Sequence, residues 1–382
     1  MTAEAIRDEP DRLVADVGRL VDACARSPQR GDGELQAELD QLAARTVELQ
    51  LERIAAYRRL WCAGGLDRAR DEKARPGAWR RTPPVPVAAF KEPGLELWTA
   101  PPRLVFRSSG TTVGRHRRSE HHHPYPDLYR RIVDASFPAA CLERALLDGA
   151  DRAPMLSLIP PLAEVPDSSL GFMIDHVLAR WGARGSRSVL GAGGLDARSA
   201  HAFLSEHARG GRPVLVVATA LALAGLLEAL RERPLERRLP PGSVVFETGG
   251  FKGRERDMTR SELVAHTGEQ LGIPPERIVR EYGMTELTSQ AYTRALGGGD
   301  PDVFFAPPWL LWRLLDPHTG AEVAPGAPGL LCFFDLGNVG SISHLLTEDV
   351  GRAAGEGGFE LLGRASDAEL RGCSLTAEAL LR

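Results

Sequence analysis

The chain has 382 residues, 43% of them hydrophobic and 26% charged, a composition typical of a soluble globular protein with one large domain or two ordinary ones. Its net charge of −4, without a dense basic block, argues against a nucleic-acid-binding surface. No stretch reaches the roughly 20 apolar residues of a membrane span, and residues 1–11 lack the apolar core of an export signal. The five scattered cysteines form no Cys-x-x-Cys pair, so we expect neither disulfides nor zinc, and a cytoplasmic location.

The first 75 residues are predicted to be helical. Leu13, Val17 and Leu20 recur at helical spacing, and a second, longer helix is indicated over residues 35–54. A connector rich in Pro and Arg follows at residues 75–86. We expect the N-terminal helices, residues 1–80, to pack on the remainder of the chain.

Strands and helices are predicted to alternate from residue 104 onward. The expected strands are residues 104–106, 155–159, 214–219, 244–247 and 278–281, and the expected helices are residues 170–181, 197–209, 221–231 and 260–271. This alternation is typical of a largely parallel sheet covered on both faces. We therefore expect an α/β core over residues 81–303.

The pattern changes after Phe304 to β runs separated by Gly, Pro and Asp turns. They are residues 310–315, 330–334, 342–346 and 359–362. We expect a small antiparallel barrel or sheet over residues 304–365. A short C-terminal tail, residues 366–382, completes the expected organisation.

A loop of hydroxyls and glycines, residues 108–114, directly follows the first predicted strand. Its sequence is Ser-Ser-Gly-Thr-Thr-Val-Gly, and Arg115, Arg117 and Arg118 come next. Such a loop converges backbone N–H groups and hydroxyl donors on an anion. It lacks the Gly-Lys-Ser/Thr ending of a P-loop. The alternative is an ordinary Ser/Gly-rich turn.

Two more turns at predicted strand ends carry groups that suit a nucleotide. Residues 281–286, Glu-Tyr-Gly-Met-Thr-Glu, offer a ring for a purine, a hydroxyl for a phosphate and a carboxylate for Mg²⁺. Residues 247–254 are rich in glycine, and ligands of open α/β sheets bind at the carboxyl ends of strands. The alternatives are a strand-to-helix turn in which Thr285 caps a helix, and a plain loop.

One acidic and one basic residue follow the later β runs. Asp349 can accept hydrogen bonds from both ribose hydroxyls, and Arg364 can reach a ribose or phosphate oxygen. Exposed turn residues of no function have the same appearance.

In this order and spacing the segments resemble the adenylate-forming superfamily, which includes acyl-CoA synthetases, firefly luciferase and the adenylation domains of nonribosomal peptide synthetases. Residues 108–114 are similar to its phosphate-binding motif, residues 248–251 to its adenine-contacting turn, and residues 282–286 to its Tyr-Gly-x-Thr-Glu signature. Asp349 corresponds to its ribose-binding aspartate, and Gly363-Arg364 to its hinge motif. The resemblance implies an ATP site formed by Ser108, Ser109, Gly110, Thr111, Thr112, Gly249, Gly250, Phe251, Tyr282, Gly283, Asp349 and Arg364.

The LuxE-like acyl-protein synthetases are the branch that the chain resembles more closely. The similarity lies in Phe90-Lys91, residues 108–112, residues 247–252 and residues 368–375. In that family a cysteine near the C-terminus accepts the activated acyl group, and Cys373 stands in the corresponding context. A lone cysteine with no function is the alternative.

Two departures from the superfamily pattern concern lysines and length. Arg115 stands near the place where the phosphate loop usually continues to a lysine, and only 18 residues follow Arg364. We therefore expect the mobile C-terminal domain, with its catalytic lysine, to be missing or vestigial. Lys91 and Lys252 are the candidates to replace that lysine.

The resemblance implies adenylation of a carboxylic acid, fatty or aromatic, with ATP and Mg²⁺. Thr285 and Glu286 would serve catalysis, with Glu286 on the metal. The acyl group would then pass to a thiol of Cys373, coenzyme A or a partner reductase. The alternative is a catalytically reduced subunit that binds nucleotide or acyl groups within a reductase complex. The sequence leaves a homo-oligomeric state open.

Residues 121–123 are three histidines in a row. They lack a ligand spacing for a metal, and we expect one of them or Tyr125 to line the acyl pocket.

Overall fold

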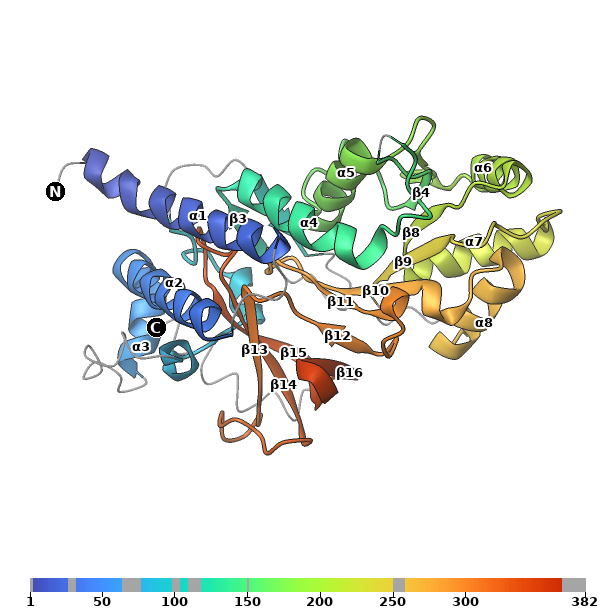
Figure 1. The fold of residues 1–382 in the computed structure, drawn as a ribbon. Coiled ribbons are helices and arrows are strands. Elements are labelled where there is room, and N and C mark those ends of the chain that lie inside the picture. The colour runs from blue at the N-terminus through green and yellow to red at the C-terminus, as the bar shows by residue number, and fades with distance from the viewer. Residues whose placement is uncertain are drawn as a thin grey trace.

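The computed structural model describes residues 3–26, 32–63, 77–97, 104–108, 118–149, 151–249 and 258–365 (Figure 1). Within these ranges the α-helices are α1 (Ala3–Arg26), α2 (Asp32–Arg53), α3 (Ala55–Ala63), α4 (Pro126–Cys141), α5 (Ser169–Trp181), α6 (Ala197–Gly210), α7 (Ala220–Glu232) and α8 (Arg260–Leu271). Short 3₁₀ turns are η3 (Ala78–Arg81), η4 (Val87–Lys91), η5 (Pro275–Arg277), η6 (Ala295–Gly297) and η7 (Gly355–Gly357).

One mixed sheet joins most of the strands. Its path is β13 (Leu310–Leu315), β14 (Pro328–Asp335), β15 (His344–Ala354), β16 (Gly358–Arg364), β12 (Val303–Phe305), β11 (Ala291–Thr293), β10 (Ile278–Tyr282), β9 (Val244–Thr248), β8 (Leu215–Thr219), β4 (Met155–Leu158) and β5 (Arg187–Ser188). The short β1 (Val85–Pro86) pairs with β15. Two hairpins stand apart from this sheet: β2 (Leu104–Arg107) with β3 (Glu120–His123), and β6 (Leu190–Gly191) with β7 (Gly194–Leu195).

The parallel half, strands β5, β4, β8, β9 and β10, is covered on both faces, as expected. Successive side chains of a strand point to opposite faces. Val216 packs with helices α6, α7 and α8, whereas Leu215 and Val217 pack with helices α4 and α5. Apolar residues at consecutive positions are therefore both buried, which is why these strands read as continuous hydrophobic runs.

Local signals explain where the helices of this half begin. Ser168, Asp196, Thr219 and Thr259 each accept a hydrogen bond from a backbone N–H of the first turn of α5, α6, α7 and α8. These side chains satisfy donors that have no partner inside the helix, so they fix its start.

The β-rich half is continuous with the parallel sheet, because β11 pairs antiparallel with β10 and β12 pairs with β11. The strands of this half pair antiparallel, as expected, but they belong to the same sheet as the parallel strands, and residue 303 lies inside β12. The predicted strand at residues 104–106 also differs from expectation, since β2 pairs antiparallel with β3 outside the parallel sheet. The domain boundaries stay predictions.

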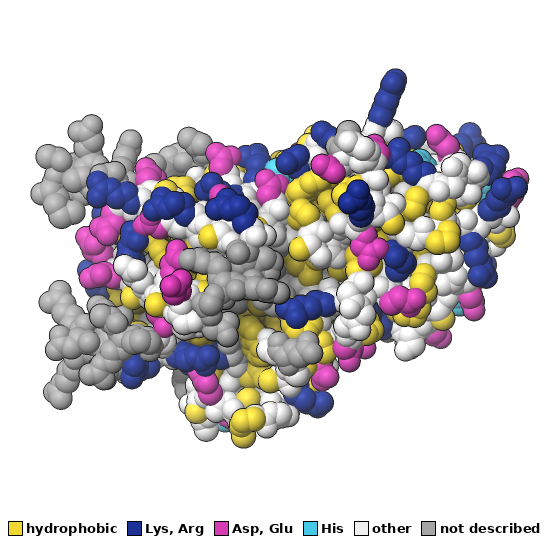
Figure 2. Space-filling view, viewed as in Figure 1, with side chains coloured by type: hydrophobic (Ala, Val, Ile, Leu, Met, Phe, Trp, Pro, Cys, Tyr) yellow, Lys and Arg dark blue, Asp and Glu magenta, His cyan; other side chains and the backbone are white. Residues whose placement is uncertain are grey.

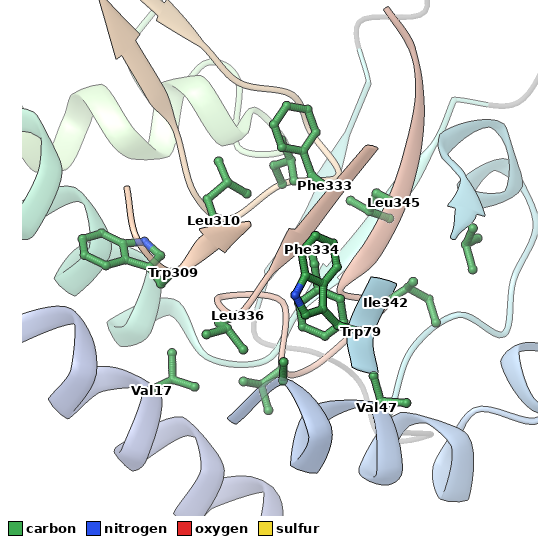
Figure 3. Packing of buried hydrophobic residues seen from close by; sticks show 14 of the residues in the cluster. Val17, Val47, Trp79, Trp309, Leu310, Phe333, Phe334, Leu336, Ile342 and Leu345 are labelled. Carbon is green, nitrogen blue, oxygen red and sulfur yellow. The ribbon is translucent and has the colours of Figure 1, made fainter. Parts of the chain in front are cut away.

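The N-terminal helices lie against the β-rich half and α4 (Figures 1 and 3). Val17 of α1 and Val47 of α2 belong to the same buried cluster as Trp79, Phe334 and Leu336. The apolar faces of these helices are thus part of the main core.

On the face in Figure 2, basic and acidic side chains are interspersed over the coloured atoms. Such a mixed surface is usual for a protein of small net charge. None of the helices that the structure describes is both long and apolar enough to cross a membrane.

Candidate active site

Residues 283–290, here called the 283–290 turn, join β10 to β11 at the carboxyl end of the parallel strands. They form turns and bends without a helix, so the alternative in which Thr285 caps a helix is wrong. His121 Nδ1 donates to the carbonyl oxygen of Thr285 at 2.8 Å, and Asn338 Nδ2 donates to that of Glu286 at 2.8 Å. The turn that carries both candidate catalytic residues is therefore fixed from two sides.

The side chain of Glu286 is largely enclosed, with 7% of the residue exposed. A buried carboxylate is costly unless hydrogen bonds or a cation compensate its charge. Glu286 places on this fixed turn a carboxylate, the type of group that binds Mg²⁺ in proteins. In the part of the chain that the structure describes, no three His, Cys, Asp or Glu side chains gather as a metal site.

Glycine at position 283 leaves room for a neighbouring carboxylate. A Cβ atom at this position would collide with the carboxylate of Glu281. That carboxylate is buried and accepts a hydrogen bond from Thr248 Oγ1 on the adjacent strand β9. Gly249, which follows Thr248 in the sequence, has φ +68°, in the left-handed region that favours glycine. The ends of β9 and β10 are thereby joined by side chains as well as by the sheet.

Asp349 of β15 connects two other candidate residues. Tyr282 donates its hydroxyl to Asp349 Oδ2 at 2.8 Å, and Arg364 Nε donates to Asp349 Oδ1 at 3.2 Å. Burial raises the pKa of Tyr282 well above its ordinary value, and the Asp349 carboxylate adds to this, so the phenol stays a donor. Three residues chosen from separate motifs are therefore in direct contact.

The ring of Tyr282 lies mostly in the core, with 6% of the residue exposed. Its centroid is 5.5 Å from that of Phe333, 5.7 Å from Phe359 and 6.1 Å from Phe304. This packing orients the hydroxyl toward Asp349 and leaves little ring surface for a purine.

The β2–β3 hairpin flanks residues 109–117 in sequence. At its open end Ser108 N donates to the Ser119 carbonyl at 3.0 Å, and Ser119 N donates to Ser108 Oγ at 3.0 Å. Arg118 donates to Asp167 at 2.9 Å and also to the Ser108 carbonyl. Arg107 pairs with Glu120 at 2.9 Å. The ends of the candidate phosphate loop are therefore held together and tied to the residues that precede α5.

The three histidines of β3 alternate in direction, as strand geometry requires. His121 and His123 are buried, and His123 Nε2 lies 2.9 Å from Thr288 Oγ1. Burial lowers the pKa of His121 to about 4. His121 is therefore neutral at physiological pH and acts as a hydrogen-bond donor to the 283–290 turn. This contact was not predicted, because strand spacing identifies the buried face but not its partner.

Lys91, at the end of η4, lines a cavity of about 360 Å³. Arg107, Arg118 and His122 of the hairpin also line it, together with Glu92, Glu96 and Glu120. Lys91 therefore lies beside the base of the candidate phosphate loop.

Several predicted site residues lie outside the described residues. They are Ser109, Gly110, Thr111, Thr112, Gly250, Phe251, Lys252 and Cys373, and the tail from residue 366.

Asp335 and Asn338, which sequence reasoning missed, lie beneath the 283–290 turn. Asp335 accepts hydrogen bonds from Thr288 N at 2.9 Å, Ser289 N at 2.8 Å, Ser289 Oγ at 2.7 Å and Gly337 N at 2.8 Å. Burial raises the pKa of Asp335, an effect that these donors oppose. The only signal in the sequence is polar residues directly after an apolar β run.

A buried Cys–His pair lies in the β-rich half. Cys332 Sγ is 3.2 Å from His344 Nε2, and His344 Nδ1 is 2.6 Å from Thr82 Oγ1. Burial raises the pKa of Cys332 to about 12 and lowers that of His344 well below its ordinary value. Both groups are neutral, so Cys332 lacks the thiolate that a nucleophile needs.

Comparison with known families gives one match in the second half of the chain. Residues 208–381 match the family "Acyl-protein synthetase, LuxE". The match covers 174 residues from α6 through the region of Cys373 and contains residues 247–254 and 282–286, Asp349 and Arg364. Among curated proteins, none matches this chain.

Solved structures with the same fold include two of a 2-hydroxyisobutyryl-CoA ligase. An open conformation in complex with 2-HIB-AMP and CoA aligns over 88% of this chain and 76% of that chain, with a TM-score of 0.61 and 16% identity. A postadenylation state in complex with 2-HIB-AMP aligns over 88% of this chain and 69% of that chain, with a TM-score of 0.61 and 15% identity. The expected fold and the resemblance to LuxE-like proteins are confirmed.

Proposed function

We propose that this chain is an acyl-adenylate-forming ligase of the LuxE acyl-protein synthetase type, which activates a fatty or aromatic acid and then passes the acyl group to a thiol. The observation that carries the proposal is the meeting of three separate motifs at one edge of the sheet. The ends of β9 and β10, the 283–290 turn and the Tyr282–Asp349–Arg364 contact all lie there. Ligands of open α/β sheets bind at this edge.

ATP would lie across these motifs. We place the adenine near Gly250, Phe251 and Tyr282, and the ribose hydroxyls at Asp349. Arg364, already in contact with Asp349, would approach the ribose or a phosphate. The phosphates would lie over Ser108, Ser109, Gly110, Thr111 and Thr112.

In the first step a carboxylate oxygen of the acid attacks the α-phosphorus of ATP. The bond from that phosphorus to the bridging oxygen breaks, and pyrophosphate leaves with both electrons of that bond. Such a transfer depends on in-line placement and on neutralising charge. The hydroxyls of Thr111, Thr112 and Thr285 would donate to phosphate oxygens. Neutral His121 holds the backbone of Thr285 in place.

Glu286 fits a Mg²⁺ ligand because it is an enclosed carboxylate on a fixed turn. Protein sites for Mg²⁺ commonly supply one or two carboxylates, and substrate phosphates and water supply the other ligands. When bound, Mg²⁺ would neutralise phosphate charge. Lys91 and Lys252 are the proposed cations for the role that a C-terminal-domain lysine has elsewhere, and Lys91 already lies beside the hairpin base.

In the second step a thiolate attacks the acyl carbonyl carbon, and the bond to the AMP oxygen breaks. The products are a thioester and AMP, which leaves with the bonding electrons. Cys373, inside the matched region, is the proposed acceptor. A reductase partner would then receive the acyl group. Coenzyme A and a cysteine of that partner are the other candidate acceptors.

Exchange of labelled pyrophosphate into ATP tests the first step. We expect Mg²⁺-dependent exchange that requires one member of a panel of fatty and aromatic acids. A purified chain that binds MgATP but supports no exchange with any acid would contradict the proposal and favour the scaffold alternative.

Covalent labelling by radioactive acid and ATP tests the second step. Cys373→Ser should keep exchange and lose the label. Cys62→Ser, which changes an exposed thiol outside the matched region, is the control and should keep both. A label that persists in Cys373→Ser would assign the acceptor role elsewhere.

A further inference from the structure

Gln50 is a fully buried amide in helix α2, and its partners lie at the other end of the chain. Its Nε2 donates to the carbonyl oxygen of Asn338 at 3.1 Å and to Ser343 Oγ at 2.9 Å. Its Oε1 accepts from Ser343 N at 3.2 Å. The amide therefore binds both ends of the segment 338–343, which is part of the connection between β14 and β15.

Asn338 links this segment to the 283–290 turn. Its Nδ2 donates to the Glu286 carbonyl at 2.8 Å, and its Oδ1 accepts from Thr288 N at 3.1 Å and from Thr288 Oγ1 at 2.6 Å. A continuous set of hydrogen bonds thus runs from α2 through Asn338 to the backbone of the turn that carries Glu286.

The environment of Gln50 argues against a packing role alone. The same face of α2 carries Ala43, Val47 and, just beyond the helix, Ile54, all buried. A leucine or methionine would suit such a face, because a buried amide is unfavourable unless its polar atoms are bonded. Gln50 is polar at this position and both of its polar atoms are bonded to the segment that holds the turn.

We propose that Gln50 is a positioning residue, through which the N-terminal helices set the place of the Thr285–Glu286 backbone. The inference rests on the proposed function, in which Glu286 holds the metal of MgATP. Without the amide, the Ser343 N–H loses its acceptor, and the Asn338 carbonyl keeps only the hydrogen bonds from Ser341 N and Ser343 Oγ. Segment 338–343 then relaxes, and the Asn338 side chain no longer holds the turn in one position.

Steady-state pyrophosphate exchange of Gln50→Met tests this role. Methionine has a similar volume and no hydrogen-bonding amide. We expect the KM for MgATP to rise about tenfold, the scale of one lost buried hydrogen bond of the site. Thr46→Val is the matched control, since the Thr46 hydroxyl bonds only to the Leu42 carbonyl of its own helix among the described contacts. Its KM should stay within twofold of wild type.

A structural role alone would reduce the active fraction, so kcat would fall while the KM for MgATP stayed at the wild-type value. That result would overturn the proposal. If Gln50→Met does not fold, Ser343→Ala takes its place. It removes one of the two acceptors of Gln50 Nε2, and we expect a two- to threefold rise in KM. An unchanged KM in that variant would equally contradict the proposal.

Amide hydrogen exchange gives a readout that is independent of activity. In wild type, Thr288 N and Ser289 N donate to Asp335, which should protect them. We expect peptides spanning residues 283–292 to exchange about tenfold faster in Gln50→Met and at the wild-type rate in Thr46→Val. Equal rates in Gln50→Met and wild type would refute the coupling. If the peptides respond while wild type supports no pyrophosphate exchange, the proposed function fails and the coupling stands.

Discussion

Replacing Asp335 with asparagine tests the network beneath the 283–290 turn without creating a cavity. The carboxylate is fully buried and accepts hydrogen bonds from Thr288 N, Ser289 N, Ser289 Oγ and Gly337 N. Asparagine can direct its oxygen to the Thr288 and Ser289 amides, and the Ser289 hydroxyl can rotate to accept from the new NH₂. The Gly337 N–H then faces a donor.

One charge-assisted hydrogen bond is therefore lost, and the others become neutral. Hydrogen bonds to charged groups contribute about 1.5–3 kcal/mol each and neutral ones about 1 kcal/mol. After relief of the buried charge, we expect a decrease of about 2–4 kcal/mol in the free energy of unfolding. With about 2.1 cal/mol/K of unfolding entropy per residue, this is a fall of about 3 to 5 °C in Tm for 382 residues.

Urea unfolding followed by tryptophan fluorescence, together with calorimetry, measures this change. The control is Asp316→Asn, the same substitution in an exposed turn. There a single oxygen, Oδ1, accepts from His318 N, Thr319 N and Thr319 Oγ1, and asparagine retains it. We expect a loss below about 1 kcal/mol for the control. A loss in Asp335→Asn no larger than that of the control would refute the reasoning.

Three further predictions concern the 283–290 turn and its neighbours. The free energy of unfolding should fall as pH drops from 6.5 to about 4, because unfolded His121 takes up a proton that the folded state, with a pKa of about 4, does not. In His121→Gln this pH-dependent decrease in the free energy of unfolding should be smaller by up to about 3 kcal/mol. A variant whose free energy of unfolding changes with pH as in wild type would contradict the assignment. Glu286→Gln should slow pyrophosphate exchange about 10²–10³-fold, the effect of losing one electrostatic group at a reacting centre; a normal rate would exclude Glu286 from the site. Gly283→Ala should cost about 1–3 kcal/mol in thermal unfolding, because its Cβ meets the Glu281 carboxylate, and an unchanged Tm would show that this carboxylate has room to move.

Much of the fold was predictable from the sequence alone. Continuous apolar runs predicted the parallel strands, and capping residues such as Ser168 and Thr259 mark helix starts within one or two residues. These signals are local, since burial pattern and backbone capping depend on residues a few positions apart. The same holds for the Tyr282–Glu286 segment at the end of β10, which the sequence placed at a strand end.

The pairing of strands and the partners of polar groups were decided by the tertiary structure. Residues 104–106 were expected in the parallel sheet but form a hairpin with β3, because a strand's own pattern does not specify its neighbour. In the same way, the sequence marks Gln50 only as a polar residue among the apolar positions of a helix. Its partner Asn338 is 288 residues away, and a hydrogen bond over that distance exists only once the sheet and the N-terminal helices have packed together.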